Sequence, residues 1–342
     1  MKPFLVIAAA CLLPLTGWAG NPDHGAMGDR LLGVLQHQFG TFQTHATQRA
    51  EEAEGFCAGR STEEEVTSAF RATWLAWAPL DPYQFGPMET LGAALRVNFF
   101  PDKKGFVGRA LTQLRRLSAE EQANPAVIAR YSVAAQGLPA IERLLFDAPR
   151  DAPAQCPVLI GITGQLAATS NALYDQWFGQ PGWADLVRSA GPDNPTYLSD
   201  QEFSRQMFTA LGFSILRMRD HRLKRPLGSY QRAFPKRAEA WRAGLSTRII
   251  AAQLHGMEPV ISNGFGPALP EEIRAELTRR LSDLAQRLEK IDQPLQNAVE
   301  DPLLRVRIEG VISRFQTLQI YLEDTVGPAL GLQAGFSAGD GD

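Results

Sequence analysis

The strongest constraint on the fold is a set of apolar residues that recur every three or four positions near the C-terminus. Between positions 271 and 295 the set consists of Ile273, Leu277, Leu281, Leu284, Leu288, Ile291 and Leu295. This spacing places the whole set on one face of an α-helix, whereas a half-buried strand would need an apolar residue at every second position. The segment therefore predicts an amphipathic helix that buries one face.

The same period recurs along most of the chain. After the breaks at Pro294 and Pro302, a second stripe covers 304–322, and a third covers 203–218. The two C-terminal stripes predict helices that pack antiparallel. Further helices are expected at 27–54, 62–78, 126–146, 157–178 and 237–254. Because strand-like alternation is hard to find, we predict an all-α protein.

Two segments interrupt the helical pattern. Residues 79–105 are rich in Pro, Gly and aromatic side chains, and residues 191–195 collect residues that start turns. A long irregular segment is usually functional or disordered, and the aromatic content of 79–105 argues against disorder. We place the boundary between two packed helical-bundle halves at the second break. The halves are then 27–190 and 196–332, followed by a tail at 333–342.

The first residues have the features of a secretory signal peptide. Lys2 supplies a positive charge, an apolar run follows, and small residues precede an expected cleavage after Ala19. That run is too short to span a bilayer, and no other stretch approaches the roughly 20 apolar residues that a spanning helix needs. We therefore expect a periplasmic protein without a transmembrane segment in its mature chain. A lipid anchor on Cys11 is the alternative, since residues 8–11 resemble a lipobox.

Removal of the leader at 1–19 leaves two cysteines, Cys57 and Cys156. In an oxidising compartment, two cysteines without metal-type spacing are more simply a disulfide than a ligand set. We predict that they pair and close a loop of about 100 residues, which stabilises the fold by a few kcal/mol.

The charge distribution does not suggest a nucleic-acid binder. Of the 34 basic and 37 acidic residues, the leader contains only Lys2, so the net charge of the mature chain is about −4. Residues 217–242 contain nine Lys or Arg against Asp220 and Glu239. We interpret this segment as a solvated helix end, with a patch for an acidic partner or an anionic membrane surface as the alternative.

Common catalytic signatures are absent from the sequence. It contains no His-Glu-x-x-His zinc helix, no Gly-x-Ser-x-Gly elbow, no phosphate loop and no dinucleotide fingerprint. His255 and Glu258 have an i, i+3 spacing, but we expect the helix to stop between them because of Gly256 and Pro259. No catalytic residue is assigned.

Four segments together resemble one family. Residues 134–146 are similar to the Gly-x-His-x-x-Glu signature of imelysins, and 85–87 with 96–103 resemble its Gly-Pro and aromatic-Pro-Asp-Lys elements. Residues 239–246 resemble its Glu-x-Trp-Arg-Ser-Gly-x-Ser helix, with Ala243 in place of Ser. The ending 335–342 is similar to that of an iron-regulated, lipoprotein-like branch, in which Asp340 and Asp342 would be oxygen ligands or part of a disordered end. The chain thus looks imelysin-like over nearly all of its mature length.

This resemblance implies a two-part helical bundle with a site between the halves, in a family associated both with peptidase activity and with iron uptake. The expected ligand-binding residues are Phe85, Gly86, Pro87, Arg96, Gly137, Glu142, Arg242 and Ser246. The Phe85-Gly86-Pro87 turn has a second interpretation as a structural loop.

The signature itself is altered, because Pro139 occupies the position of its His. Proline has no side-chain donor or acceptor, so the pair that could ligate a metal is incomplete, and Glu142 is the remaining candidate ligand. Gly137 can end one helix, Pro139 suits the first turn of the next, and Glu142 lies near that helix's positive end. Glu142 is then either an anion held by backbone dipoles or an ion-pair partner of Arg143, Arg242 or another cation that fixes a helix junction.

The expected function is that of an accessory or ligand-binding component of iron uptake in the cell envelope. Its partner would be an envelope protein or an iron-related ligand, although an intact ligand set for iron is missing. The alternatives are a metallopeptidase with Glu142 as general base, which needs an activated water, and a structural or assembly protein.

Overall fold

The computed structural model describes residues 22–147 and 152–333, which form helices joined by turns and loops. Within these ranges the only extended pairing is an isolated bridge between Ser229 and Arg232. The predicted all-α fold is therefore confirmed. The leader at 1–19, Cys11 and the tail from 334 onward lie outside the described residues.

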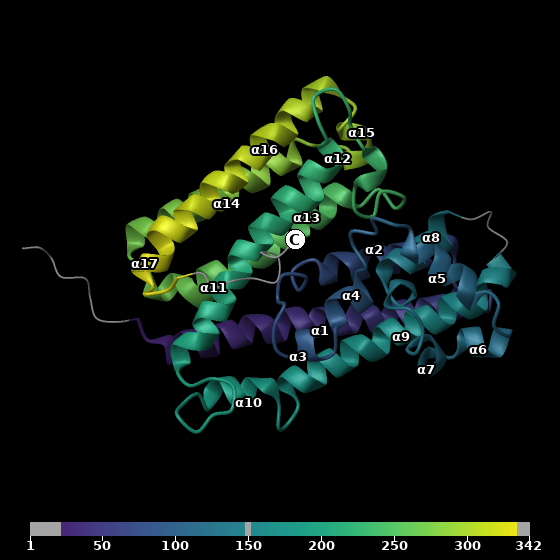
Figure 1. The fold of residues 1–342 in the computed structure, drawn as a ribbon, viewed down its shortest axis with the longest axis horizontal. Coiled ribbons are helices and arrows are strands. Elements are labelled where there is room, and N and C mark those ends of the chain that lie inside the picture. The colour runs from purple at the N-terminus through teal and green to yellow at the C-terminus, as the bar shows by residue number, and fades with distance from the viewer. Residues whose placement is uncertain (1–21, 148–151, 334–342) are drawn as a thin grey trace, which may run out of the picture.

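The N-terminal half is built on two long helices. α1 (His24–Cys57) runs beside α9 (Ala152–Phe178), and α2 (Glu63–Trp77) packs against α1 (Figure 1). A capping box between Thr62 and Glu65 starts α2 by satisfying its first backbone N–H groups. The remaining helices of this half are short: α3 (Pro87–Thr90), α4 (Ala93–Val97), α5 (Phe106–Leu114), α6 (Ala119–Ala123), α7 (Pro125–Ile128), η1 (Val133–Ala135), α8 (Leu138–Phe146) and α10 (Trp183–Arg188).

The C-terminal half contains longer helices joined by irregular turns. Its main elements are α11 (Asp200–Leu216), α13 (Ser246–Pro259), α14 (Glu271–Glu289) and α16 (Pro302–Tyr321). Three π-helical segments extend α11, α13 and α16 in turn: η2 (Arg217–Lys224), η4 (Val260–Phe265) and η6 (Leu322–Val326). The short elements are α12 (Arg225–Leu227), η3 (Pro235–Arg237), η5 (Gly266–Ala268), α15 (Leu295–Ala298) and α17 (Gly327–Ala329).

The apolar stripes become the buried faces of the C-terminal helices. In α14 the buried residues are Leu277, Leu281, Leu284 and Leu288, and in α16 they are Leu304, Ile308, Val311, Phe315 and Leu318. The two helices lie side by side and run in opposite directions, with α15 and α17 at opposite ends of the pair (Figure 1). Each helix buries the apolar face that its sequence period predicts, and the antiparallel packing expected for the pair is confirmed.

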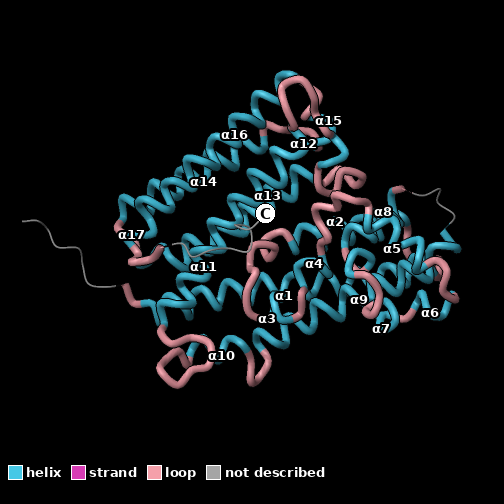
Figure 2. Tube along the Cα trace, viewed as in Figure 1, coloured by secondary structure: helices cyan, strands magenta, loops and turns pink. Residues whose placement is uncertain are grey.

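Two expected helices are interrupted. The segment 126–146 divides into α7, η1 and α8, and the segment 237–254 begins as an irregular turn, so that α13 starts only at Ser246. Figure 2 shows both interruptions as loop between helical tubes. The second interruption contacts α8, because Glu142 accepts hydrogen bonds from the backbone of Arg242 and Ala243.

One hydrophobic core connects the two halves. It includes Leu31 and Phe42 from α1 together with Leu284 from α14 and Phe315 from α16. The segment 191–195 lies between α10 and α11 and is not helical, and whether it separates two domains stays a prediction. None of the helices in the described ranges has the length and apolar character needed to cross a membrane.

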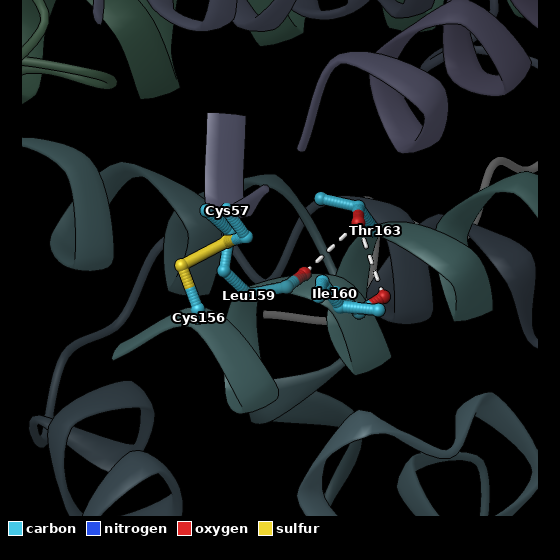
Figure 3. Close-up of a disulfide and its surroundings, with 5 residues drawn as sticks. All are labelled: Cys57, Cys156, Leu159, Ile160 and Thr163. Atoms are coloured by element: carbon cyan, nitrogen blue, oxygen red, sulfur yellow. Dashed lines mark hydrogen bonds between the residues drawn. A yellow bond between two sulfur atoms is a disulfide. The ribbon is translucent and has the colours of Figure 1, made fainter. Parts of the chain in front are cut away.

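The predicted disulfide is present. Cys57 at the end of α1 is bonded to Cys156 near the start of α9, with the two Cα atoms 5.5 Å apart (Figure 3). The bond joins positions separated by 99 residues. It therefore fixes the end of one long helix to the beginning of its main packing partner.

Candidate functional site

A cleft of ≈ 550 Å³ opens between α8 of the N-terminal half and the turn that precedes α13. Its walls come from residues 99–107, from α8 and from residues 225–242. The aromatic side chains of Trp74, Phe99, Phe100 and Trp241 line it beside charged groups. The volume is in the range of sites that hold small molecules.

Glu142 on α8 joins the two walls of the cleft. Its buried carboxylate accepts hydrogen bonds at Oε1 from the backbone N–H groups of Arg242 at 2.9 Å and Ala243 at 3.1 Å. Burial raises the pKa of Glu142 to about 7, while these two amides and the Arg242 guanidinium act in the opposite direction. Backbone groups thus hold this carboxyl group, but they belong to the turn before α13 and not to the first turn of α8, where the sequence placed them.

Arg242 extends the same junction toward solvent. Its Nη1 lies 3.7 Å from Oε2 of Glu142, and its Nε donates to the carboxylate of Asp147 at the end of α8. The guanidinium also lies over the ring of Trp241, 4.3 Å from its centroid. The expected pairing of Glu142 with Arg242 therefore occurs together with the backbone hydrogen bonds.

The turn at 238–245 has the backbone shape needed to present its amides. Ala240 has a φ of 48°, which L-residues rarely adopt, and Gly244 has a φ of 67°. A non-glycine residue in this region costs on the order of 1 kcal/mol or more and persists only where its surroundings fix it. Here the contacts of Glu239 on one side and of Glu142 on the other fix the turn. The helix expected at 237–254 fails at its start for this reason.

Glu239 belongs to a buried ionic network behind the cleft. Its carboxylate accepts hydrogen bonds from Nε of Arg222 and, at 2.6 Å, from Nδ2 of Asn98. Arg222 also donates to Asp81 at 2.9 Å, and Arg217 donates to the same Asp81 carboxylate at 2.8 Å. Two carboxylates and two guanidinium groups thus share one buried cluster, which satisfies most of their hydrogen-bonding groups.

The local helix geometry explains how two arginines reach one aspartate. Arg217 and Arg222 are five residues apart on the π-helix η2, whose hydrogen bonds also run between residues five apart. Burial acts to raise the pKa of Asp81, but the guanidinium groups of Arg217 and Arg222 lower it overall. Asp81 therefore stays ionised within the cluster.

This network was not predicted from the sequence, although some of its members were visible there. Asn98 and Glu239 lie inside two of the segments that carry the family resemblance. Asp81, by contrast, is 136 residues from Arg217 and shows no local pattern that would connect the two. Only the tertiary fold brings them together.

The altered signature lies on the wall of the cleft. Pro139 is in the first turn of α8, as predicted, and lines the cleft beside Glu142. Gly137 caps that helix, and a Cβ added there would approach the backbone oxygens of Val97 and Arg96 to 2.2 and 2.3 Å. Gly137 is therefore required because α4 crosses directly over it.

The residues around Glu142 do not fit a bare metal ion. Pro139 offers no ligand atom, and Oε1 of Glu142 already accepts two backbone hydrogen bonds. Across the described ranges, no group of three or more His, Cys, Asp or Glu side chains is arranged to hold a metal. His255 and Glu258 do share a helix face, contrary to expectation, because α13 continues through Gly256 to Pro259, and their side chains lie 3.6 Å apart.

The Phe85-Gly86-Pro87 turn does not line the cleft. The Phe85 ring lies 5.8 Å from that of Trp177, and Gly86, with a φ of 59°, leaves room for Trp177 and Trp183. This arrangement matches the structural-loop interpretation, and ligand binding by these residues stays a prediction.

Two more of the expected residues contact protein groups away from the cleft. Arg96 donates to the backbone of Leu91 and to Gln136, both at 2.9 Å. Ser246, at the start of α13, is buried with its hydroxyl 3.4 Å from Gln296. Of the predicted site residues, Glu142 and Arg242 are the two that meet in the cleft, and Gly137 lies behind its wall.

The basic segment 217–242 is not simply a solvated helix end. Arg217 and Arg222 are buried in the ionic network, which a run of surface charges would not predict. Arg225, Lys236 and Arg237 line the cleft instead. The segment therefore divides between a structural cluster and the wall of the candidate site.

Comparison with known proteins relates this fold to one family. The family model described as Imelysin matches residues 36–320. An imelysin-like protein from Psychrobacter arcticum 273-4 has a similar structure, with a TM-score of 0.76, 19% sequence identity and coverage of 93% of this chain and 100% of that chain. A protein from Parabacteroides distasonis ATCC 8503, described as an iron-regulated protein A precursor, has a TM-score of 0.71, 13% identity and coverage of 89% and 96%. No curated protein gives a significant match.

Proposed function

This chain belongs to the imelysin family, and from that premise we propose that it is an accessory protein of iron uptake in the cell envelope that binds a ligand in the cleft between its two halves. The observation that carries the proposal is the position of the cleft. Its walls contain Pro139 and Glu142 of the altered signature together with Trp241 and Arg242 of a second family segment. These two of the four segments that carry the resemblance thus contribute to one solvent-open site.

The link to iron is supported by a structural relative. The protein from Parabacteroides distasonis, whose fold this chain shares, is described as iron-regulated. At 13% identity that likeness concerns the fold, and the role in iron uptake is our extension of it to this chain.

The envelope location is supported by two independent features. The leader at 1–19 has the charge, apolar run and small residues of an export signal. The disulfide between Cys57 and Cys156 is a kind of bond that persists in oxidising compartments such as the periplasm. Cell fractionation with N-terminal sequencing of the purified protein tests this part, and a cytosolic protein that retains Met1 would contradict it.

The iron-uptake role is tested in the organism that carries the gene. We expect the amount of protein to rise when iron is limiting, and a deletion strain to take up radioactive iron more slowly than its parent. Complementation with the unaltered gene should restore the uptake rate. Unchanged protein amounts together with equal uptake in both strains would refute the proposal.

A further inference from the structure

The carboxylates that line the cleft already have partners in the protein. Asp102 accepts hydrogen bonds from the backbone N–H groups of Phe106 at 2.7 Å and Val107 at 3.1 Å, and so begins α5. Glu142 is bound by two amides, and Glu239 belongs to the ionic network. Most of the carboxylate oxygens in the cleft are therefore already used by donors of the protein, which leaves few ligand atoms for a cation.

The basic side chains that line the cleft, by contrast, include four without an acidic partner among the described residues. Lys103, Arg225, Lys236 and Arg237 all line it, and none of them forms an ion pair within the described ranges. Lys103, Lys236 and Arg237 are exposed. The amine of Lys236 lies over the Trp241 ring, 5.6 Å from the ring centroid. The guanidinium of Arg237 lies over the Phe234 ring, 3.7 Å from its centroid. Aromatic contacts thus orient two of these cations without neutralising them.

Arg225 shows most clearly that a counter-charge is missing. Its half-buried guanidinium stacks on Phe100 at 5.9 Å, while Arg217 stacks on the same ring at 5.5 Å. Its Nε is buried and has no hydrogen-bond partner in the part of the chain that the structure describes. Burial lowers the pKa of Arg225, and the neighbouring Arg237 and Arg217 lower it further. Such crowding of like charges is unfavourable unless an anion joins it.

We infer that the cleft binds a small oxygen-rich anion with several negative charges, of the polycarboxylate class, where Lys103, Arg225, Lys236 and Arg237 line it. Guanidinium groups match carboxylates with paired hydrogen bonds, and ammonium groups add point charges. This inference deepens the proposed function, on which it rests, because a carrier of this kind would take up iron as an anionic chelate and not as a bare ion.

The inference is tested by calorimetric titration of the mature protein with citrate, once iron-free and once as the ferric complex. We expect a dissociation constant at or below about 100 µM at low ionic strength, weakening as salt screens the charges. Failure of both forms to bind below millimolar concentration, or tighter binding of free Fe³⁺ or Zn²⁺ than of either form, would overturn the inference.

Matched variants locate the binding to the cleft. The double variant Lys236→Gln/Arg237→Gln should weaken citrate binding about a hundredfold, since each of the two lost charge-assisted contacts is worth about tenfold. Arg232→Gln is the control, because Arg232 stacks on the same Phe234 ring at 5.0 Å but does not line the cleft. Lys104→Gln is a second control next to Lys103. Equal losses in the double variant and in the controls would show that the cleft is not the site.

The two proposals fail in different ways. Binding of iron-free citrate at the cleft without any iron phenotype of the deletion strain would leave the anion site intact and remove the role in iron uptake. An iron phenotype without cleft-dependent citrate binding would keep the role and remove the anion site.

Discussion

The carboxylate of Glu142 accepts a hydrogen bond of 2.9 Å from the backbone N–H of Arg242, a residue 100 positions later in the chain. Together with the bond from Ala243 at 3.1 Å, this contact ties α8 to the turn that precedes α13. The same carboxylate is buried, which favours its protonated form. The side chain of Glu142 therefore both joins two parts of the fold and titrates near neutral pH.

The first prediction follows from that combination. Between the ordinary value of 4.5 and the raised pKa of about 7, the folded protein binds more protons at Glu142 than the unfolded chain does. Its contribution to the free energy of unfolding must then fall as pH rises through this window, by up to about 3 kcal/mol. Glu142→Gln keeps an oxygen that can accept both amide bonds but cannot titrate, so its stability should not show this decline.

Urea unfolding of both proteins between pH 5 and pH 8 measures the difference. Glu142→Ala is the control for the hydrogen bonds, because it leaves two buried amides without an acceptor and should lose about 2–5 kcal/mol at every pH. Parallel pH profiles for the unaltered protein and Glu142→Gln would contradict the raised pKa.

The site could be foreseen only in part, and the reason is physical. The stripes of α14 and α16 are periodic, so the sequence alone predicts their buried faces. The turn at 238–245 contains Ala, Trp and Leu at helix-like spacing, yet Glu142 from 100 residues away binds its amides and prevents the helix from starting there. Tertiary contacts of this kind override local propensity and leave no local trace.

A second prediction concerns the buried network. Arg222, with 1% of its side chain exposed, forms ion pairs with both Asp81 and Glu239. Arg222→Met should lower the free energy of unfolding at pH 7 by about 3–5 kcal/mol, because the buried Glu239 then keeps only its hydrogen bond from Asn98 and two buried carboxylates share the single charge of Arg217. Lys224→Met is the control, since Lys224 is half exposed and its pair with Asp220 is worth about 0–1 kcal/mol.

The pH dependence of that variant provides a further check. The lowered pKa of Asp81 gives the unaltered protein stability above the ordinary value of 3.8, which is lost as pH falls through the lowered pKa. The cost of Arg222→Met should therefore shrink on acidification. A cost that stays constant down to the acid transition would show that the charge pairing does not stabilise the fold.

A third prediction distinguishes two glycines. At Gly137 an added Cβ would meet the backbone oxygen of Val97 at 2.2 Å, so Gly137→Ala must separate α8 from α4 and should cost about 2 kcal/mol or more. At Gly212, in the middle of α11, an added Cβ meets nothing within 4 Å. Gly212→Ala should instead stabilise by about 0.5–1 kcal/mol. Thermal unfolding of the two variants tests the contrast, and equal shifts in the same direction would refute it.

A fourth prediction concerns the bond between Cys57 and Cys156. Replacing both residues by Ser should lower the free energy of unfolding by about 3–5 kcal/mol, because a loop of 99 residues is no longer closed in the unfolded chain. The unaltered protein measured in a reductant should lose a similar amount, which controls for the serine side chains. Thiol titration of the denatured, non-reduced mature protein should find no free thiol, and two thiols would disprove the bond.

The fifth prediction concerns Pro139, which replaces the His that could ligate a metal together with Glu142. Position 139 lines the cleft three residues before Glu142, whose Oε2 lies 3.7 Å from Nη1 of Arg242 and accepts no backbone hydrogen bond from the described residues. An imidazole at 139 would share a helix face with that oxygen and complete a two-ligand site. Pro139→His should therefore bind Zn²⁺ about tenfold more tightly than the unaltered protein, in a titration with a zinc-sensitive dye.

Pro139→Ala is the control for loss of the proline ring, and the gain in zinc affinity should disappear when Glu142→Gln is added. A gain that persists without the Glu142 carboxylate would place the metal elsewhere and break the link between Pro139 and the missing metal site.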